Sequence, residues 1–468
     1  MQTDTKTDVK TKNGKISVII GLGTTGLSCA RYYAARNLPF KVVDSRVAPP
    51  GLACLKKSFP RVEIELGAFN PATLFNASEL VISPGVSLDV PEIRDAIATG
   101  VPVTGDIDIF SKQVSAPIIA VTGSNGKSTV VALLAEIFSR ANINFGLGGN
   151  LDGDRAKPAL DLLLESESDP GEAREKTLYL LELSSFQLET TMALGAEVAV
   201  LLNLSEDHMD RYPDMAAYHR TKQKVFIGAR QIVVNRDDSY SKPLDAHDAL
   251  VWDYGVNSPS THGFGLLEVD GDQYLSFRFQ ELISIQELKV FGQHNVSNVL
   301  AAITIATAAG IDREAILDAV RNFAGLPHRC QWVRTLRGVE YYNDSKGTNV
   351  GATVAAIEGL GQKLSGHIIL IAGGIGKGAD FAPLAPAVNR WAREVILIGR
   401  DAVELAATFD SDTRIFFADG LPEAVVLAAS HATAGDAILL SPACASFDMF
   451  GNFQQRGEVF INAVESLA

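Results

Sequence analysis

A glycine-rich turn, VTGSNGKST at residues 121–129, carries the residue types that bind the phosphates of a nucleotide. Its glycines allow backbone N–H groups to converge on an anion, and the helix predicted to follow adds a positive field. Lys127 has the length to reach a terminal phosphate, and the hydroxyl group of Ser128 can ligate Mg²⁺. Nucleotide loops of the usual form have glycine where Val121 stands, so we predict a variant phosphate-binding loop.

A second glycine-rich turn, GLGTTG at residues 21–26, follows an apolar run near the start of the chain. A later apolar run, residues 40–43, ends at Asp44, whose carboxylate is of the type that holds ribose or uridine hydroxyl groups. Ser45 and Arg46 add a hydroxyl group and a positive charge suited to a nucleotide. Two interpretations stay open from these residues, because the same pattern also closes strand-to-helix turns that bind no ligand.

Polar side chains that suit a metal site follow further apolar runs. Glu182 ends the run at residues 178–181, and a carboxylate at such a strand end can ligate Mg²⁺; a helix cap or a surface acid is the alternative. His208 follows the next run among several acidic residues, which favours a site over a structural histidine. Lys222 lies one helical turn after Tyr218 in a predicted helix, where its residue type alone predicts a surface lysine.

Polar residues in the second half of the chain suit the nucleoside of the same nucleotide. Asn295 and Asn298 lie three residues apart on one face of a predicted helix, so their amides can bind the edge of a base; helix capping is the alternative. Arg329, Asp344 and Lys346 lie in predicted loops near the start of a third α/β segment. We expect these charges to contact a ribose and phosphates.

Apolar runs that alternate with helical patterns predict an α/β fold of three domains in series. We expect a Rossmann-like N-terminal domain at residues 1–105, of which the polar tail at residues 1–14 is disordered. A central P-loop ATPase domain with a mostly parallel sheet follows at residues 106–325, and a Rossmann-like C-terminal domain at residues 326–468. Short alternating stretches at residues 249–291 predict an antiparallel excursion of the central sheet.

Composition narrows the class of protein. The 468 residues are 47% hydrophobic and 21% charged, ordinary values for a globular enzyme, and the net charge of −14 argues against a nucleic-acid partner. The four cysteines lack metal-ligand spacing, so we expect free thiols in a reducing compartment. No apolar run approaches the roughly 18 residues that span a bilayer, and the polar start lacks a hydrophobic signal region. We predict a cytoplasmic protein without a membrane partner.

In their order along nearly the whole chain, the motifs resemble those of the Mur ligase family. The resemblance is carried by TGSNGKST at residues 122–129, ELSSFQLE at 182–189, EDHMDRYP at 206–213, NDSKGTN at 343–349 and SPACASFDMFGNFQQRG at 441–457. Members of this family activate a carboxylate with ATP to form an acyl phosphate, which an amine attacks to give an amide, ADP and phosphate. The resemblance implies the same reaction here, and it accounts for the valine in the variant loop.

The resemblance also implies substrates and cofactors. The substrates implied are UDP-N-acetylmuramoyl-L-alanine and D-glutamate, so that GLGTTG would bind a UDP-sugar and not NAD. The cofactors implied are ATP, Mg²⁺ at two sites, and CO₂ as a carbamate of Lys222, and the protein would be a monomer. A carbamate is an anionic oxygen ligand for Mg²⁺, which an ammonium group would repel. A related ligase that adds a different amino acid is the alternative, whereas a folylpolyglutamate synthetase would not need the first domain.

Residues that match the family's motifs take implied roles. The catalytic residues implied are Lys127, Glu182, His208, Lys222 and Lys346. Those implied to bind ATP are Gly123, Ser124, Asn125, Gly126, Lys127, Ser128, Thr129, Asn295, Asn298, Arg329 and Asp344. Those implied to bind the UDP-substrate are Thr24, Thr25, Asp44, Ser45, Arg46, Ser83 and Asn150. Those implied to bind D-glutamate are Thr348, Lys377, Ser446, Phe447 and Phe453. The Mg²⁺ ligands implied are Ser128, Glu182, His208 and carbamylated Lys222.

One segment departs from the family pattern. After Asn150 the sequence reads LDGDRAKPAL, where the family more often has a short turn, and the acidic stretch at residues 152–176 looks inserted. We predict that this stretch forms a helix and a solvated loop.

Two alternatives from other classes explain less of the sequence. A dehydrogenase accounts for GLGTTG and Asp44 but leaves the loop around Lys127 without a role. A GTP-dependent switch protein needs a guanine-binding motif, and residues 235–238, NRDD, have arginine where that motif has lysine.

Overall fold

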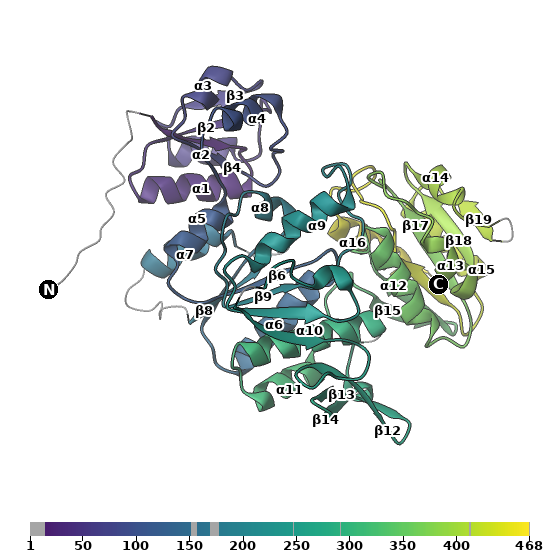
Figure 1. Cartoon of the computed structure of the whole chain (residues 1–468). Coiled ribbons are helices and arrows are strands. Elements are labelled where there is room, and N and C mark those ends of the chain that lie inside the picture. Colours follow the sequence, from purple (N-terminus) through teal and green to yellow (C-terminus); the bar gives the residue numbers. More distant parts are fainter. Residues whose placement is uncertain are drawn as a thin grey trace. The chain divides into compact units, whose positions relative to one another are not determined.

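The computed structural model describes residues 15–150, 157–168, 177–246, 248–290, 292–410 and 413–467 (Figure 1). The tail predicted at residues 1–14 and much of the acidic segment at residues 152–176 lie outside the described residues. Three β-sheets with helical connections form the fold. The predicted class, three α/β domains with mostly parallel sheets, is confirmed, whereas the domain limits after residues 105 and 325 stay predictions.

The chain divides into two compact units. One unit holds residues 1–122, 143–199 and 221–231. The other unit holds residues 123–142, 200–220 and 232–468. The N-terminal sheet lies wholly in the first unit, and the C-terminal sheet wholly in the second.

The N-terminal sheet has strand order β3-β2-β1-β4-β5, and its strands pair in parallel. Its strands are β1 (Ser17–Ile20), β2 (Phe40–Asp44), β3 (Ile64–Leu66), β4 (Glu79–Ile82) and β5 (Val103–Thr104). Its helices, drawn in purple and blue in Figure 1, are α1 (Thr24–Ala35), α2 (Leu52–Ser58), α3 (Pro71–Phe75) and α4 (Pro91–Ala98). All residues of β1 are buried, as expected for a central strand with helices on both faces.

The turn between β1 and α1 requires glycine at two positions. Gly21 has a φ of 92°, a left-handed conformation that favours glycine. A Cβ atom on Gly26 would lie 1.9 Å from the carbonyl oxygen of Gly21. Helix α1 therefore begins this close to the strand end only because residue 26 has no side chain.

The central sheet has nine strands in the order β14-β13-β12-β11-β10-β9-β6-β8-β7. In chain order they are β6 (Ile118–Thr122), β7 (Phe145–Gly149), β8 (Leu178–Glu182), β9 (Val198–Leu201), β10 (Gln231–Asn235), β11 (Leu250–Tyr254), β12 (Phe264–Val269), β13 (Asp272–Phe277) and β14 (Gln280–Ser284). Strand β8 pairs in parallel with both β6 and β7, and the register places Glu182 beside Val121 and beside Gly149. A carboxylate therefore ends the strand next to the one that leads into the phosphate loop.

The excursion predicted at residues 249–291 is antiparallel in part. Strands β12, β13 and β14 pair in antiparallel fashion, which confirms the prediction for them. Strands β11 and β12 pair in parallel, so the prediction was wrong there. The connection between these two strands is long enough to return to the same end of the sheet. Arg236 holds the connection by donating hydrogen bonds to the side chain of Asn257 and the carbonyl oxygen of Ser258, both at 3.0 Å.

Helices connect and follow the strands of the central sheet, and they include the helices predicted after the phosphate loop and around residues 218–222 and 295–298. They are α5 (Asp106–Gln113), α6 (Lys127–Arg140), α7 (Ala159–Ser168), α8 (Ser185–Glu189), α9 (Met215–Gln223), α10 (Gln293–Ala308) and α11 (Arg313–Asn322). Helix α9 carries both Tyr218 and Lys222, α10 carries Asn295 and Asn298, and α7 confirms a helix in the acidic segment. None of the helices in the described ranges combines the length and the hydropathy needed to cross a membrane.

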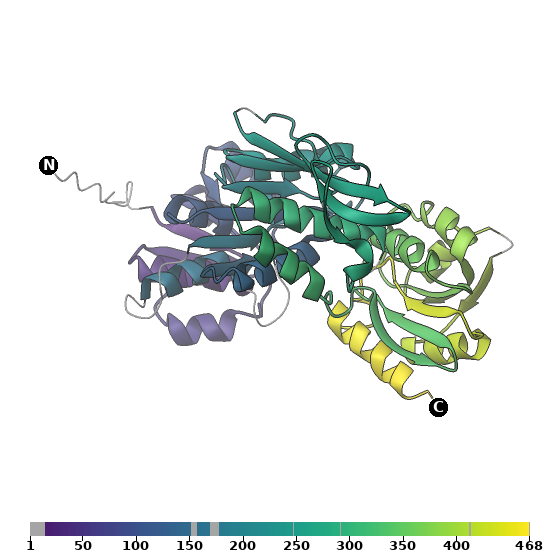
Figure 2. The same ribbon diagram turned by 90° about the horizontal axis from the view of Figure 1, so that it is seen from below.

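The C-terminal sheet has strand order β15-β16-β20-β17-β18-β19, with β15 antiparallel and the other pairs parallel. Its strands are β15 (Gln331–Leu336), β16 (Val339–Asn343), β17 (Ile368–Gly373), β18 (Ala392–Ile398), β19 (Arg414–Phe417) and β20 (Ala437–Leu440). Its helices are α12 (Val350–Gly361), α13 (Leu384–Trp391), α14 (Ala402–Ala406), α15 (Leu421–His431) and α16 (Phe453–Glu465), the last drawn in yellow in Figure 2. Alternate residues of the strands pack with α12, α13 and α14 on one face and with α15 and α16 on the other.

Gly26→Ala is expected to lower the free energy of unfolding by about 1–3 kcal/mol or more, because the added methyl group overlaps the carbonyl oxygen of Gly21. Urea denaturation of the two proteins measures the difference. Gly23→Ala is the matched control, since a Cβ there meets no atom within 4 Å. The control should stay within about 0.5 kcal/mol of the wild type. Equal stability of the two variants would contradict the close approach of α1 to the strand end.

Candidate functional site

Two glycines shape the phosphate loop that joins β6 to α6. Gly126, at the start of α6, has a left-handed φ of 84°, and Gly123 has a φ of 156°. A Cβ atom on Gly126 would lie 2.3 Å from the Oδ1 atom of Asn298, so a side chain there would clash as well as strain the backbone. Val121 is fully buried within β6. The departure from the usual nucleotide loop therefore lies inside the strand and leaves the loop surface unchanged.

Asn203 holds the phosphate loop with both its side chain and its backbone. Its Oδ1 atom accepts a hydrogen bond from the backbone N–H of Asn125 at 2.8 Å, and its Nδ2 atom donates to the Asn125 carbonyl oxygen at 3.0 Å. Its own carbonyl oxygen accepts from the Ser124 N–H at 3.0 Å. These bonds fix the loop before a ligand binds, which lowers the entropy cost of binding.

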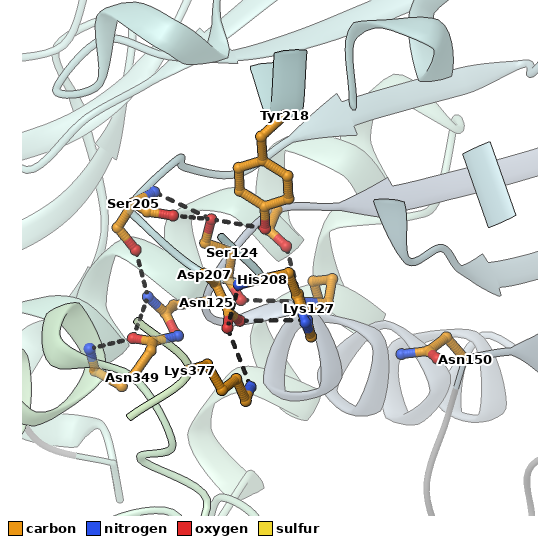
Figure 3. Close-up of polar contacts among 12 residues, drawn as sticks. Ser124, Asn125, Lys127, Asn150, Ser205, Asp207, His208, Tyr218, Asn349 and Lys377 are labelled. Carbon is orange, nitrogen blue, oxygen red and sulfur yellow. Dashed lines mark hydrogen bonds and ion pairs between the residues drawn. The ribbon is translucent and has the colours of Figure 1, made fainter. Parts of the chain in front are cut away.

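Residues distant in the sequence hold the same loop from other sides (Figure 3). The hydroxyl group of Ser124 donates to the carbonyl oxygen of Ser205 at 2.9 Å and lies 3.2 Å from the hydroxyl group of Tyr218. Asn125 and Asn349 exchange side-chain hydrogen bonds of 3.0 and 3.3 Å. Asn349 also caps α12 by accepting from the N–H of Ala352 at 2.9 Å. The loop is thus attached to the start of a helix of the C-terminal sheet.

Two cations lie at the phosphate loop. The ammonium group of Lys127 donates to the carbonyl oxygens of Gly123 and Ser124 at 2.7 and 2.9 Å. The guanidinium group of Arg329 donates to the hydroxyl group of Ser128 at 2.9 Å. An anion that binds at this loop therefore meets two positive charges that are already in position.

A pocket beside the loop gathers most of the residues predicted to bind ATP. The predicted residues that line it are Asn125, Gly126, Thr129, Asn295, Asn298, Arg329, Asp344 and Lys346. The Nδ2 atom of Asn298 lies 3.4 Å from the Oδ1 atom of Asn295, which places both amides on one face of α10 as predicted. The amides are not helix caps, because Gly292 occupies the cap position.

Asp344 is a buried acceptor at the wall of this pocket. Its Oδ2 atom accepts from the hydroxyl group of Ser441 at 2.7 Å, and its Oδ1 atom accepts from the N–H of Cys330 at 3.1 Å. Burial raises the pKa of Asp344 to about 6, against these hydrogen bonds, which lower it. The carboxylate is therefore ionised at neutral pH and can accept further hydrogen bonds from a ligand's hydroxyl groups.

Asp207 links His208 to a lysine of the C-terminal sheet (Figure 3). His208 has a left-handed φ of 59°, and its backbone N–H donates to the Oδ1 atom of Asp207 at 3.0 Å. The ammonium group of Lys377 donates to the same oxygen at 3.3 Å. Burial alone would raise the pKa of Asp207, but Lys377, His208 and Lys127 outweigh it and hold the pKa below its ordinary value. A negative charge thus lies among the cations of the predicted site.

Residues predicted to bind D-glutamate lie in loops that follow adjacent strands. Thr348 follows β16, Ser446 follows β20 and Lys377 follows β17. Backbone hydrogen bonds of 2.9 Å join the loop after β20 to each of the other two loops. Ser446 is buried, whereas the side chain of Phe447 is 71% exposed. The structure therefore brings the first three residues to one edge of the sheet and leaves Phe447 at the surface.

Helix α16 supports the same edge through its first residues. The ammonium group of Lys346 lies 3.9 Å from the centre of the Phe453 ring, a cation–π contact. Arg456 is 1% exposed and donates to the carbonyl oxygens of Ser345 and Cys444 at 2.8 and 3.0 Å. Burial lowers the pKa of Arg456 to about 10. Arg456 therefore holds the loops after β16 and β20 together from inside the protein.

A second pocket, within the first unit, gathers all the residues predicted to bind the UDP-substrate. The predicted residues that line it are Thr24, Thr25, Asp44, Ser45, Arg46, Ser83 and Asn150. They come from the carboxyl ends of β1, β2, β4 and β7. The GLGTTG turn therefore lies in a pocket and is not only a connection between a strand and a helix.

Asp44 and Arg46 form a closed pair in this pocket. The buried carboxylate of Asp44 accepts from the Leu22 N–H at 2.6 Å and from the Nη2 and Nε atoms of Arg46 at 2.7 and 2.9 Å. Burial alone would raise the pKa of Asp44, and these hydrogen bonds outweigh it and hold the pKa below its ordinary value. A ligand hydroxyl group that binds Asp44 must therefore share its oxygens with the half-exposed guanidinium group of Arg46.

Glu182 fits a divalent cation. Its side chain is buried, and its Oε2 atom has no hydrogen-bond partner among the described residues. The Oε1 atom accepts only a long hydrogen bond, 3.5 Å, from the Nδ2 atom of Asn150. A buried anionic oxygen without a donor is costly unless a cation binds it. Among the described residues, no group of three or more His, Cys, Asp or Glu side chains could hold a metal ion.

Lys222 is buried, so the surface lysine predicted from its residue type was wrong. Its side chain is 1% exposed, and its Nζ atom lies 3.4 Å from the hydroxyl group of Thr122, the last residue of β6. Helix α9 turns this residue inward. A buried ammonium group is costly unless other groups compensate its charge.

Several residues of the site have no role predicted from the sequence. Asn203 follows an apolar run, as Glu182 does, and that position was its only signal. Asp207 stands beside His208 within a motif, so its place was visible although its ion pair was not. Arg456 stands within the motif at residues 441–457, but its burial was not visible, because arginine is usually exposed.

Three α/β domains in series, with a phosphate loop in the middle one, define a nucleotide-binding protein of the multidomain type. Comparison with known families narrows this class to ligases: the MurD-like Mur ligase N-terminal domain matches residues 15–105, the Mur ligase middle domain residues 121–306, and the Mur ligase glutamate ligase domain residues 328–444. The chain belongs to the Mur ligase family. It is accordingly an ATP-dependent ligase.

Relatives and solved structures agree with this family. The chain is 50% identical to the UDP-N-acetylmuramoylalanine–D-glutamate ligase of Pseudomonas aeruginosa, over 96% of this chain and 98% of that protein. It is 47% identical to the ligase of the same name from Hahella chejuensis, again over 96% and 98%. The structure of UDP-N-acetylmuramate-alanine ligase from Thermotoga maritima has 17% identity, a TM-score of 0.58, and coverage of 96% of this chain and 99% of that chain. At this identity the last similarity shows the fold alone.

Asn203→Ala is expected to raise the KM for ATP by about tenfold, because the phosphate loop loses two side-chain hydrogen bonds that fix its shape. Steady-state kinetics with varied ATP measure the change. Asn389→Ala is the matched control, since the Asn389 side chain contacts only Asp410 and Thr413 in the structure's described part. An unchanged KM in Asn203→Ala would show that the loop does not depend on this residue.

Proposed function

We propose that this protein joins D-glutamate to UDP-N-acetylmuramoyl-L-alanine, with conversion of ATP to ADP and phosphate, in the synthesis of the peptidoglycan precursor. One observation carries the proposal: every residue predicted for the UDP-substrate lines a single pocket, in a chain that is half identical to ligases of that name. A Mur ligase that adds a different amino acid is the alternative, because the phosphate loop would serve it equally well.

In this proposal, ATP phosphorylates the carboxyl group of UDP-N-acetylmuramoyl-L-alanine to form an acyl phosphate. The backbone of residues 123–129 and the ammonium group of Lys127 bind the phosphates, so Lys127 exchanges its two carbonyl partners for phosphate oxygens. Asn295 and Asn298 bind the adenine base through their amides. Arg329 binds a phosphate, and the carboxylate of Asp344 accepts from the ribose hydroxyl groups.

Residues of this chain would hold Mg²⁺ at two sites, where the ions would supply positive charge to neutralise and orient the phosphates. Glu182 and Ser128 would hold one ion, and His208 and carbamylated Lys222 would hold the other. The unpartnered Oε2 atom of Glu182 supports the first site. The burial of Lys222 supports the second, because a carbamate converts a buried cation into an anionic oxygen ligand.

Asn150 connects the UDP-substrate pocket to Glu182. It lines the pocket, its backbone N–H donates to the Glu182 carbonyl oxygen at 2.7 Å, and its side chain contacts the carboxylate. Asn150 therefore positions the end of the UDP-substrate that carries the reacting carboxyl group.

D-Glutamate binds at the carboxyl edge of the C-terminal sheet and presents its amino group to the acyl phosphate. Lys377 pairs with a carboxylate of the substrate, so it must leave Asp207, to which it now donates. Thr348 and Ser446 donate hydroxyl hydrogen bonds, and Phe447 and Phe453 cover the substrate. Lys346 lies near the reacting groups and stabilises the negative charge that develops during attack.

The remaining features of the proposal concern the setting of the protein. We infer a cytoplasmic monomer that binds small-molecule substrates and no nucleic acid or membrane. The net charge of −14 supports the absence of nucleic acid.

Release of phosphate is expected only when UDP-N-acetylmuramoyl-L-alanine, D-glutamate, ATP and Mg²⁺ are all present. A coupled phosphate assay, with each component omitted in turn, measures the dependence. L-Glutamate, L-alanine and meso-diaminopimelate serve as controls for the amino acid. Equal turnover with any of these controls would overturn the assignment of D-glutamate and favour the sister ligase.

Lys222→Ala is expected to lower kcat by about 100-fold, because the variant loses the anionic ligand that a carbamate provides. Added acetate should restore part of the activity by supplying a carboxylate in the vacated space. Lys224→Ala is the matched control: Lys224 donates to the carbonyl oxygen of Glu189 at 2.6 Å, so acetate should have no effect on it. A fully active enzyme whose Lys222 carries no carbamate by mass spectrometry would refute the role.

A further inference from the structure

Helices α1 and α7 are joined by two arginine–carboxylate pairs that no part of the proposed reaction uses. Arg31 donates from Nε to the Oδ1 atom of Asp161 at 2.8 Å, and from Nη2 to the other oxygen. Arg36 donates to both carboxylate oxygens of Glu167 at 2.6 and 2.7 Å. Both pairs have the two-bond geometry that makes an arginine–carboxylate contact strong and directional.

The two pairs form a ladder along parallel helices. Residue numbers rise together on both sides, from Arg31 on α1 to Arg36, the residue that follows α1, and from Asp161 to Glu167 on α7. The two pairs differ in exposure: the side chains of Arg31 and Asp161 are 40% and 18% exposed, and those of Arg36 and Glu167 are 31% and 41% exposed. Salt therefore screens the Arg31–Asp161 pair less than the Arg36–Glu167 pair, which is an ordinary surface pair.

Each helix is attached to one wall of the UDP-substrate pocket. Helix α1 begins with Thr24 and Thr25, which line the pocket, and Arg31 follows about 10 Å further along the helix. Helix α7 lies directly after Lys157, whose carbonyl oxygen accepts from the N–H of Gly149 in the opposite wall at 3.2 Å.

A further hydrogen bond attaches each helix to a strand. On the side of α1, the hydroxyl group of Tyr33 donates to the carboxylate of Glu79 in β4 at 2.8 Å. On the side of α7, the hydroxyl group of Tyr179 in β8 donates to Ser166 at 3.3 Å. Both helices belong to the same compact unit, so a shift of α1 along α7 would change the distance between the pocket walls.

We propose that the ladder of Arg31–Asp161 and Arg36–Glu167, here termed the α1–α7 clamp, positions the two walls of the pocket that binds the UDP-substrate. The four residues are positioning residues, because none of them lines the pocket. The two carboxylates of the clamp lie in the acidic segment at residues 152–176, which departs from the family pattern. This inference rests on the proposed function for the identity of the ligand.

The test compares the double variant Arg31→Ala/Arg36→Ala with the wild type in steady-state kinetics. The KM for UDP-N-acetylmuramoyl-L-alanine should rise about 3- to 10-fold, while kcat and the KM values for ATP and D-glutamate stay unchanged. A destabilised enzyme would not show this selective split. Equal changes in all three KM values, or no change in any, would overturn the clamp.

Two further variants separate position from charge. The swap Arg31→Asp/Asp161→Arg reverses one pair in place and should restore part of the acceptor affinity relative to Arg31→Asp alone. Lys41→Ala is the control for loss of a positive charge. Lys41 lies in β2 of the N-terminal sheet and pairs with Glu63 and Glu65 at 2.7 and 2.9 Å. A rise in acceptor KM in Lys41→Ala equal to that of the double variant would overturn the proposal.

Calorimetric binding of UDP distinguishes failure of the clamp from failure of the proposed function. A wild type that binds UDP, with the same affinity in the double variant, would overturn the clamp alone. A wild type that binds no UDP would overturn the proposed function, and amide hydrogen exchange then decides on the clamp. The amides of Gly149 and Asn150 should exchange faster in the double variant, because the wall they belong to is released; unchanged exchange would overturn the clamp.

Discussion

All strands of a parallel ladder end at one edge of the sheet, and the candidate sites of this protein depend on that constraint. The UDP-substrate pocket lies at the carboxyl ends of β1, β2, β4 and β7. The loops that carry Thr348, Ser446 and Lys377 follow three adjacent strands of the C-terminal sheet. Residues far apart in sequence therefore meet without direct pairing of their side chains, because backbone hydrogen bonds between strands fix where each loop begins.

Charged groups of the candidate sites already have hydrogen-bond partners within the protein. Lys127 donates to carbonyl oxygens of its own turn, Lys377 to Asp207, and Arg46 to Asp44. A substrate that binds must replace these contacts, so its gain is the difference between two sets of hydrogen bonds and not the full strength of one. Such exchange keeps the affinity moderate while it keeps each cation in position.

Much of the fold and of the UDP-substrate pocket could be predicted from glycine-rich turns and apolar runs in the sequence. Turn glycines such as Gly21 and apolar runs such as β1 are set by neighbours in the chain, so pattern and position agree. The burial of Lys222 could not be predicted, because it depends on which face of α9 packs inward. The hydrogen bonds of Asn203 were also hidden, since they join residues that lie 78 positions apart in the chain. Arg236 holds the connection between β11 and β12 but lies outside both strands, so the pattern of the strands alone does not predict their parallel pairing.

Arg456 holds the loop after β16, although the two are far apart in the chain. It holds Ser345 from a position 111 residues later, through a buried charge that backbone and hydroxyl oxygens solvate. A contact of this separation gains nothing until a large loop has closed, and the pairing of β16 with β20 also needs the closure of a large loop. The functional edge of the C-terminal sheet is therefore expected to acquire its native geometry together with that strand pairing, so that folding and the capacity to bind substrate are completed together.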